Sequence, residues 1–287
     1  IDIGSIDRIQ NCQASEAECQ ERIEATRLLV QALLRQILET QYPDLPEGDE
    51  YYKQESYLED LEDTPLGEGE KRIFDISSGE AQGVDRDTHP VYRETWRIFE
   101  SIVPEKYLDE FSEIHFYNDE TDRYSALVYQ KVSRRGTEES VEWRLNVNLD
   151  NFSLDQGDYN EAVETLTHEV GHVLLMNADQ MRYFEDEEEC TTYYVPALRG
   201  CAKSDSYYNA IRVHWSDDFL EWSAEWEGDL RSSELSDEAE ERLEEYYEDH
   251  EDEFTSMYAA SGPNEDAAET IAHLARDDIS EEEDTVA

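Results

Sequence analysis

A short segment of the chain, residues 167–172, reads THEVGH and holds the residue types of a metal-dependent hydrolase. His168 and His172 stand four residues apart, and Glu169 directly follows the first histidine. Residues i and i+4 lie on the same face of an α-helix, so both imidazoles can reach one zinc ion at about 2.0–2.1 Å. Glu169 can then take a proton from a water molecule that the zinc activates. The spacing therefore predicts a zinc metallopeptidase site with Glu169 as general base.

The residues around this motif predict the helix that it requires. Asp158, with Glu161 three residues later, forms a capping box, which is a signature of a helix start. Apolar residues then recur at helical spacing as far as about Met176: Ala162, Val163, Leu166, Val170, Val173 and Leu174. The alternative is a helix with two unconnected surface histidines. A motif that arose by chance, however, would have no reason to lie on a helix with apolar periodicity directly after a capping box.

The motif does not supply the third ligand that a zinc site needs. A metzincin would carry glycine and histidine three and six residues after His172. Leu175 and Ala178 occupy those positions, so that class is excluded.

Two expected helices offer candidates for the third ligand. Residues 206–226 are expected to be mostly helical and carry a tryptophan stripe of Trp215, Phe219, Trp222 and Trp226. Glu221 and Glu225 flank this stripe and are expected to be solvated, and His214 lies at its edge. Glu265 and Glu269 are four residues apart on an alanine-rich helix expected at about 264–276. Spacing alone leaves that pair open between solvent and the interior.

The C-terminal segment 255–272 resembles the Tyr-x6-Glu-x-x-Ala-Glu segment of the anthrax lethal factor-like zinc peptidases. Tyr258 precedes Glu265 by seven residues, and Ala268 and Glu269 follow in the same order. The chain resembles a family of bacterial zinc-binding metallopeptidases more closely. Its members also carry Thr-His-Glu-x-Gly-His and then a Cys-x-Thr-Tyr, Gly-Cys, Ser-Tyr-x-Asn block. Here that block lies at residues 190–193, 200–201 and 206–209.

The resemblance covers residues 160–275 well and the first 90 residues hardly at all. It implies that Glu265 completes a zinc site with the two histidines and that Tyr258 donates a hydrogen bond to the transition-state oxyanion. It further implies that Glu269 orients a zinc-bound histidine through the other ring N–H. One departure is that Glu265 lies 93 positions after His172, a larger separation than in lethal factor.

The charge balance is extreme, with 74 acidic and 23 basic residues and a net charge of −51. Such a surface repels nucleic acid and anionic membranes, so neither is expected as a partner. The acidic residues are spread along the whole chain, which favours adaptation to high salt over a recruitment surface for basic partners. The expected partner is a peptide or protein substrate.

Four cysteines form two close pairs in sequence, Cys12 with Cys19 and Cys190 with Cys201. Local pairing would give two disulfides, although four cysteines allow three connectivities. Disulfides indicate an oxidising compartment, and no apolar run is long enough to span a membrane. We therefore expect an exported protein, extracellular, periplasmic or at the cell surface. The first residue, Ile1, suggests a trimmed form whose export signal has been removed.

These elements predict an α+β zincin-like fold, in which a small twisted sheet packs on the HExxH helix. The strands are expected in the runs 114–117, 125–132 and 141–149. Apolar residues alternate along the last run, as in a half-buried strand: Trp143, Leu145, Val147 and Leu149. The expected organisation is an accessory segment at 1–88 with an amphipathic helix at 21–41, a catalytic domain at 89–276 and a disordered acidic tail at 277–287.

Two other functions compete with a peptidase. An inactive zinc-binding extracellular interaction protein would be expected to have lost the base, yet Glu169 is intact. A calcium-stabilised surface protein would be expected to carry a DxDxDG loop, and the sequence contains none.

Overall fold

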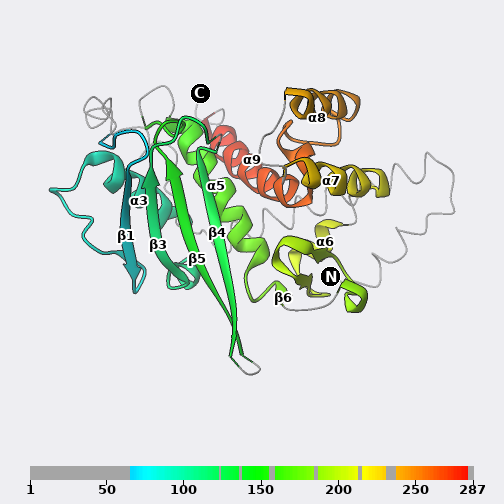
Figure 1. Cartoon of the computed structure of the whole chain (residues 1–287), viewed down its shortest axis with the longest axis horizontal. Helices are drawn as coiled ribbons and strands as arrows, with labels where there is room; N and C mark the ends of the chain where they lie inside the picture. Colours follow the sequence, from blue (N-terminus) through cyan, green and yellow to red (C-terminus); the bar gives the residue numbers. More distant parts are fainter. Residues whose placement is uncertain are drawn as a thin grey trace. The chain divides into compact units, whose positions relative to one another are not determined.

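The computed structural model describes residues 65–283, except 123, 136–137, 155–158, 184–186, 213–214 and 231–236 (Figure 1). The predictions for Cys12, Cys19, Asp158, His214 and the helix at 21–41 lie outside the described residues. Within them, seven α-helices and two sheets confirm the α+β class. They form two compact units. The sheet unit contains residues 65–173 and 275–283, and the disulfide unit contains Leu174–Leu274.

A five-stranded mixed sheet forms the centre of the sheet unit, in the order β2-β1-β3-β5-β4. Its strands are β1 (Lys71–Ser77), β2 (Glu80–Ala81), β3 (Phe111–Tyr117), β4 (Ala126–Arg135) and β5 (Glu138–Asn148). β3 and β5 are parallel, whereas every other neighbouring pair is antiparallel. Three strands therefore lie in or around the predicted runs. β1 and β2 come from the segment that was expected to be an accessory region.

One face of this sheet is buried against two helices, α3 (Pro90–Ile102) and α5 (Tyr159–Met176), which lie behind it in Figure 1. Trp143, Leu145 and Val147 alternate along β5 and are almost fully buried, as a half-buried strand requires. Tyr92 of α3 contacts Phe116 of β3 with ring centroids 4.7 Å apart. The prediction that the alternating residues of β5 face the core is confirmed.

A short helix, α4 (Glu105–Leu108), precedes β3. The sequence alone is compatible with a longer helix over residues 106–112. Instead the chain becomes extended at Phe111, which pairs with Trp143 on β5 and is buried. Burial of this aromatic side chain in the sheet outweighs local helix propensity.

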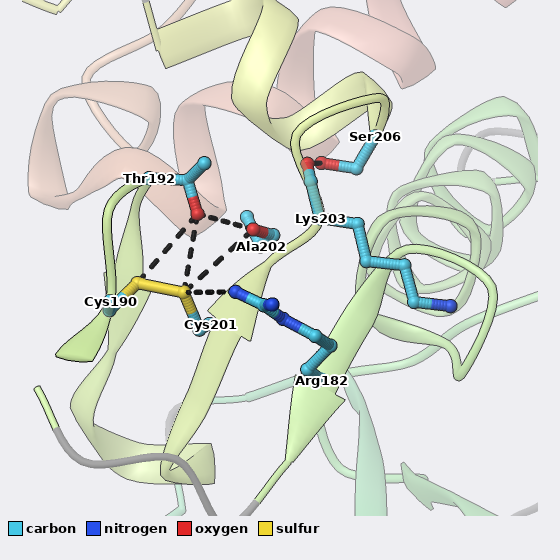
Figure 2. The surroundings of a disulfide bond; sticks show 7 residues. All are labelled: Arg182, Cys190, Thr192, Cys201, Ala202, Lys203 and Ser206. Atoms are coloured by element: carbon cyan, nitrogen blue, oxygen red, sulfur yellow. Dashed lines mark hydrogen bonds between the residues drawn. A yellow bond between two sulfur atoms is a disulfide. The ribbon is translucent and has the colours of Figure 1, made fainter.

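The disulfide unit contains a small sheet in the order β6-β8-β7. Its strands are β6 (Met181–Tyr183), β7 (Tyr194–Val195) and β8 (Gly200–Ala202), with single turns η3 (Glu187–Glu189) and η4 (Pro196–Leu198) between them. Figure 2 shows the disulfide between Cys190 and Cys201, which confirms the predicted pairing. Thr192 lies beside both sulfur atoms, and its hydroxyl also donates to the carbonyl of Ala202. The disulfide therefore ties the segment before β7 to β8.

Helices make up the rest of the disulfide unit: α6 (Tyr207–Ile211), α7 (Asp217–Leu230), α8 (Asp237–Asp249), the turn η6 (Ala259–Ser261) and the part of α9 (Pro263–Glu283) that ends at Leu274. The region 206–226 is mostly helical, as expected, but the chain forms two helices there, α6 and α7. Ser216 provides the reason, since its hydroxyl accepts a hydrogen bond from the backbone N–H of Phe219 and caps the start of α7. The tryptophan stripe, which begins at Trp215 just before α7, is buried or half-buried.

The last helix, α9, extends through residues 277–283, which were expected to belong to a disordered tail. Three of these seven residues, Glu281 to Glu283, are glutamates, which are good helix formers. No helix in the described part of the chain is long and apolar enough to cross a membrane.

Candidate metal centre

The structure brings His168, Glu169 and His172 together on α5 within the sheet unit. All three side chains are buried, with 6, 6 and 8% of their surface exposed. Their ligand atoms lie within 4.8 Å of one another. Among the side chains that the structure describes, Glu169 is the one buried carboxylate. The chain has 74 acidic residues, so composition alone does not explain why Glu169 in particular is buried.

Burial of such groups is unfavourable unless they are paired or hold a metal. Moving a carboxylate out of water costs several kcal/mol, which a partner must offset. The helix supplies the driving force, because Leu166, Val170 and Val173 are almost fully buried and fix the face that α5 turns inward. The motif is therefore held inside by the apolar residues within it and on either side of it.

The two histidines fit a shared zinc ion. Their Nε2 atoms lie 3.1 Å apart, and the ring planes are nearly perpendicular at 83°. Two nitrogen ligands at about 2.0–2.1 Å, at a tetrahedral angle, lie about 3.3 Å apart. Imidazole nitrogens with a carboxylate are also a donor set that zinc commonly takes in catalytic sites. The residues present therefore fit this metal.

Glu169 is fixed by the sheet. Its Oε2 accepts a hydrogen bond of 2.6 Å from the backbone N–H of Val128 on β4. β4 is an edge strand of the described sheet, so this N–H is available to a side chain. A hydrogen bond to an ionised carboxylate is stronger than one between neutral groups. Sequence reasoning did not identify Val128, because no local signal links residues 41 positions apart.

Tyr258, Glu265 and Glu269 all lie in the disulfide unit. Tyr258 directly precedes η6 and is 41% exposed, whereas Glu265 and Glu269 are half-buried on the first turns of α9. The oxyanion role of Tyr258 and the ligand role of Glu265 stay predictions. The other two acidic candidates, Glu221 and Glu225, are exposed on α7, as the sequence analysis expected.

The first turn of α9 is anchored on both sides of Glu265. The hydroxyl of Tyr208 donates to Asn264 Oδ1, and the indole N–H of Trp215 donates to Asp266 Oδ2 at 2.8 Å. Both donors are buried aromatic side chains, so the backbone that carries Glu265 has a defined orientation. These anchors were not identified from the sequence, since each joins residues more than fifty positions apart.

The cysteine block gains a physical role from these contacts. Tyr193 packs on Tyr208 and Trp215, with ring centroids 5.2 Å apart in both cases. Ser206 caps α6 by accepting a hydrogen bond from the N–H of Asn209. The block that carried the family resemblance therefore builds an aromatic platform beneath the first turn of α9.

No family model, curated protein or solved structure matches this chain. The family resemblance stays a prediction that rests on the residues quoted for it.

Proposed function

We propose that this protein is a zinc-dependent metallopeptidase, most simply an endopeptidase, that hydrolyses peptide bonds with Glu169 as general base. The observation that carries this proposal is the buried group of His168, Glu169 and His172, with the two Nε2 atoms 3.1 Å apart. A buried carboxylate beside two imidazoles is unfavourable as a purely structural feature, and it suits a metal-dependent hydrolase.

In this proposal His168 and His172 hold the zinc, and Glu265 supplies the third ligand. When bound, zinc acts as a Lewis acid that lowers the pKa of a water molecule toward about 7 and polarises the substrate carbonyl. Glu169 accepts the proton of the attacking water as the new C–O bond forms. It then delivers that proton to the amide nitrogen as the C–N bond breaks. Val128 N–H holds the carboxylate in one orientation through both transfers.

Tyr258 would donate its phenolic hydrogen to the oxygen that becomes negative in the transition state. Such a donor is worth a few kcal/mol in the transition state and little in the ground state. The exposed edge of β4 offers a place for an extended peptide, because an edge strand can pair with a further strand through backbone hydrogen bonds. We further infer an oxidising location outside the cytosol, since the Cys190–Cys201 disulfide persists in such compartments.

Metal analysis with a peptidase assay, in low and high salt, tests the proposal directly. We expect about one zinc per chain and hydrolysis that a chelator abolishes and added zinc restores. A protein that binds zinc and cleaves no peptide in a broad peptide library would instead be the inactive interaction protein.

Variants of Glu265 and Tyr258 should lose activity in different ways, and this difference separates the two proposed roles. Glu265→Ala removes an anionic ligand, so zinc affinity and activity should fall together. Tyr258→Phe should lower kcat by about 10- to 1,000-fold with zinc content and KM nearly unchanged, because the hydrogen bond forms mainly in the transition state. Exposed Glu221→Ala and Glu225→Ala are the matched controls. If these controls lose zinc and Glu265→Ala keeps it, the assignment of the third ligand is wrong.

A further inference from the structure

The segment before α9 holds an exposed tyrosine on a firmly bonded backbone. Tyr258 and its neighbour Met257 are 41% and 45% exposed, whereas Ala259 and Ala260 directly after them are fully buried. The carbonyl of Tyr258 accepts hydrogen bonds from both the backbone N–H and the hydroxyl of Ser261, at 3.0 and 2.7 Å. The polypeptide is therefore fixed at the point where the phenol leaves it.

A single hydroxyl connects this turn to α9. Ser256 Oγ donates to Glu269 Oε2 at 2.6 Å and accepts from the backbone N–H of Ala259 at 3.0 Å. A serine hydroxyl has one hydrogen and two lone pairs, so both bonds form together. Glu269 thereby holds Ser256, and Ser256 holds the backbone on the far side of Tyr258.

Helix α7 fixes the same turn from another direction. The indole N–H of Trp222 donates to the carbonyl of Ala260 at 2.9 Å. Gly262 lies so close to α7 that an added Cβ would come within 3.1 Å of Ser223 Oγ. Packing explains the buried alanines, but it does not explain an exposed ring at the centre of so many backbone contacts. An aromatic side chain held in place and left exposed is typical of a group that meets a ligand.

We propose that Ser256 and Glu269 are positioning residues that set the direction of the Tyr258 phenol. This inference rests on the proposed function, in which that phenol serves the transition state. It also changes the role expected for Glu269, which acts on the tyrosine turn through Ser256. Loss of the hydrogen-bond relay should therefore lower kcat and leave zinc binding intact, whereas a residue that orients a zinc-bound histidine would weaken zinc binding about 10- to 100-fold.

Kinetics of four variants test the inference. Ser256→Ala should lower kcat by about 3- to 30-fold, never more than Tyr258→Phe does, with KM and zinc content unchanged. Ser256→Thr keeps the hydroxyl and should restore most of kcat. Thr255→Ala removes an exposed neighbouring hydroxyl and is the matched control. In a Tyr258→Phe background, Ser256→Ala should have almost no further effect, because its target is already gone.

Two measurements test the relay without activity. Ser256→Ala should speed hydrogen exchange at the amide of Ala259 by at least about fivefold, and Glu269→Ala should do the same. A fluorine label on the ring of Tyr258 should give one sharp resonance in the parent and a broadened or shifted one in both variants. Unchanged exchange and an unchanged resonance overturn the inference.

The failure of this inference differs from failure of the proposed function. An active parent in which Ser256→Ala and Tyr258→Phe reduce kcat additively would show that Ser256 acts elsewhere, and the peptidase would stand. A parent without zinc-dependent hydrolysis removes the proposed function. The resonance of Tyr258 would then decide whether the relay orders the ring.

Discussion

Replacement of Glu169 by glutamine removes the proposed proton acceptor and preserves the shape of the side chain. In the parent, Oε2 accepts a hydrogen bond from Val128 N–H at 2.6 Å, so Oε1 is the oxygen that would take the proton in the reaction. A glutamine has one acceptor oxygen, and its NH2 group can only donate. The single oxygen must serve Val128, and the NH2 group must then occupy the place of Oε1.

The opposite orientation of the glutamine would set its NH2 group against the N–H of Val128. That arrangement leaves a half-buried donor unsatisfied, at a cost of about 1–3 kcal/mol, so the flipped form is populated by at most about one molecule in six. Glu169→Gln therefore loses the base almost completely. The expected fall in kcat is the whole contribution of a general base, about 100- to 10,000-fold.

Zinc content, melting temperature and steady-state kinetics of Glu169→Gln should be measured on the same preparation. Zinc should stay at the parental level, and KM should change little, because the amide keeps the volume of the carboxylate. Glu169→Asp is the matched control, because it keeps the charge and shortens the side chain by one methylene. Its kcat should lie between those of the parent and of Glu169→Gln. A glutamine variant as fast as the parent would falsify the mechanism. A variant that has lost its zinc would assign Glu169 to the metal instead.

Three further predictions concern the protein as a whole. Removal of the disulfide with a Cys190→Ala, Cys201→Ala double variant should destabilise the fold by about 3 kcal/mol for a separation of 11 residues, measured by urea unfolding; an unchanged midpoint would contradict this. Burial, followed by the nearby charges of Glu253 and Asp218, raises the pKa of Tyr246 to about 12. The neutral phenol therefore contributes its full stabilisation below about pH 10, the pKa of an unfolded tyrosine, and this stabilisation is lost as the pH rises through about 12. The melting temperature of Tyr246→Phe should therefore fall less than that of the parent between about pH 8 and pH 11, and an equal fall would refute the assignment. A net charge of −51 predicts a melting temperature that rises from dilute buffer to molar potassium chloride, and a flat profile would refute salt adaptation.

Local signals in the sequence identified what depends on local periodicity. The apolar residues of α5 recur every three or four positions, so they predicted both the helix and its buried face, and the structure buries Leu166, Val170 and Val173. The alternation along β5 predicted that Trp143 and Leu145 face the core in the same way. The pairing of Cys190 with Cys201 followed from their separation of 11 residues.

Contacts between distant segments could not be predicted. β3 lies parallel to β5 with the β4 hairpin on the far side, and periodicity within a strand carries no information about its neighbour. The hydrogen bond from Val128 to Glu169 crosses 41 residues, and that from Tyr208 to Asn264 crosses 56. Each is decided by tertiary packing. The break between α6 and α7 was missed for a different reason, since Ser216 is a recognisable cap whose signal was outweighed by the spacing of the tryptophan stripe.

The net charge indicates the salt environment, whereas the candidate site indicates chemistry, and burial distinguishes the carboxylates that belong to each. A chain with 74 acidic residues places carboxylates wherever water reaches them, so an exposed glutamate such as Glu221 says nothing about chemistry. Glu169 differs because the described structure removes it from water, next to two imidazoles and against a backbone donor. Salt screens charges on the surface, but it acts weakly on a buried group. High salt should therefore change the stability of this protein strongly, and it should change the proton transfer by Glu169 only as far as it changes the fraction of folded molecules.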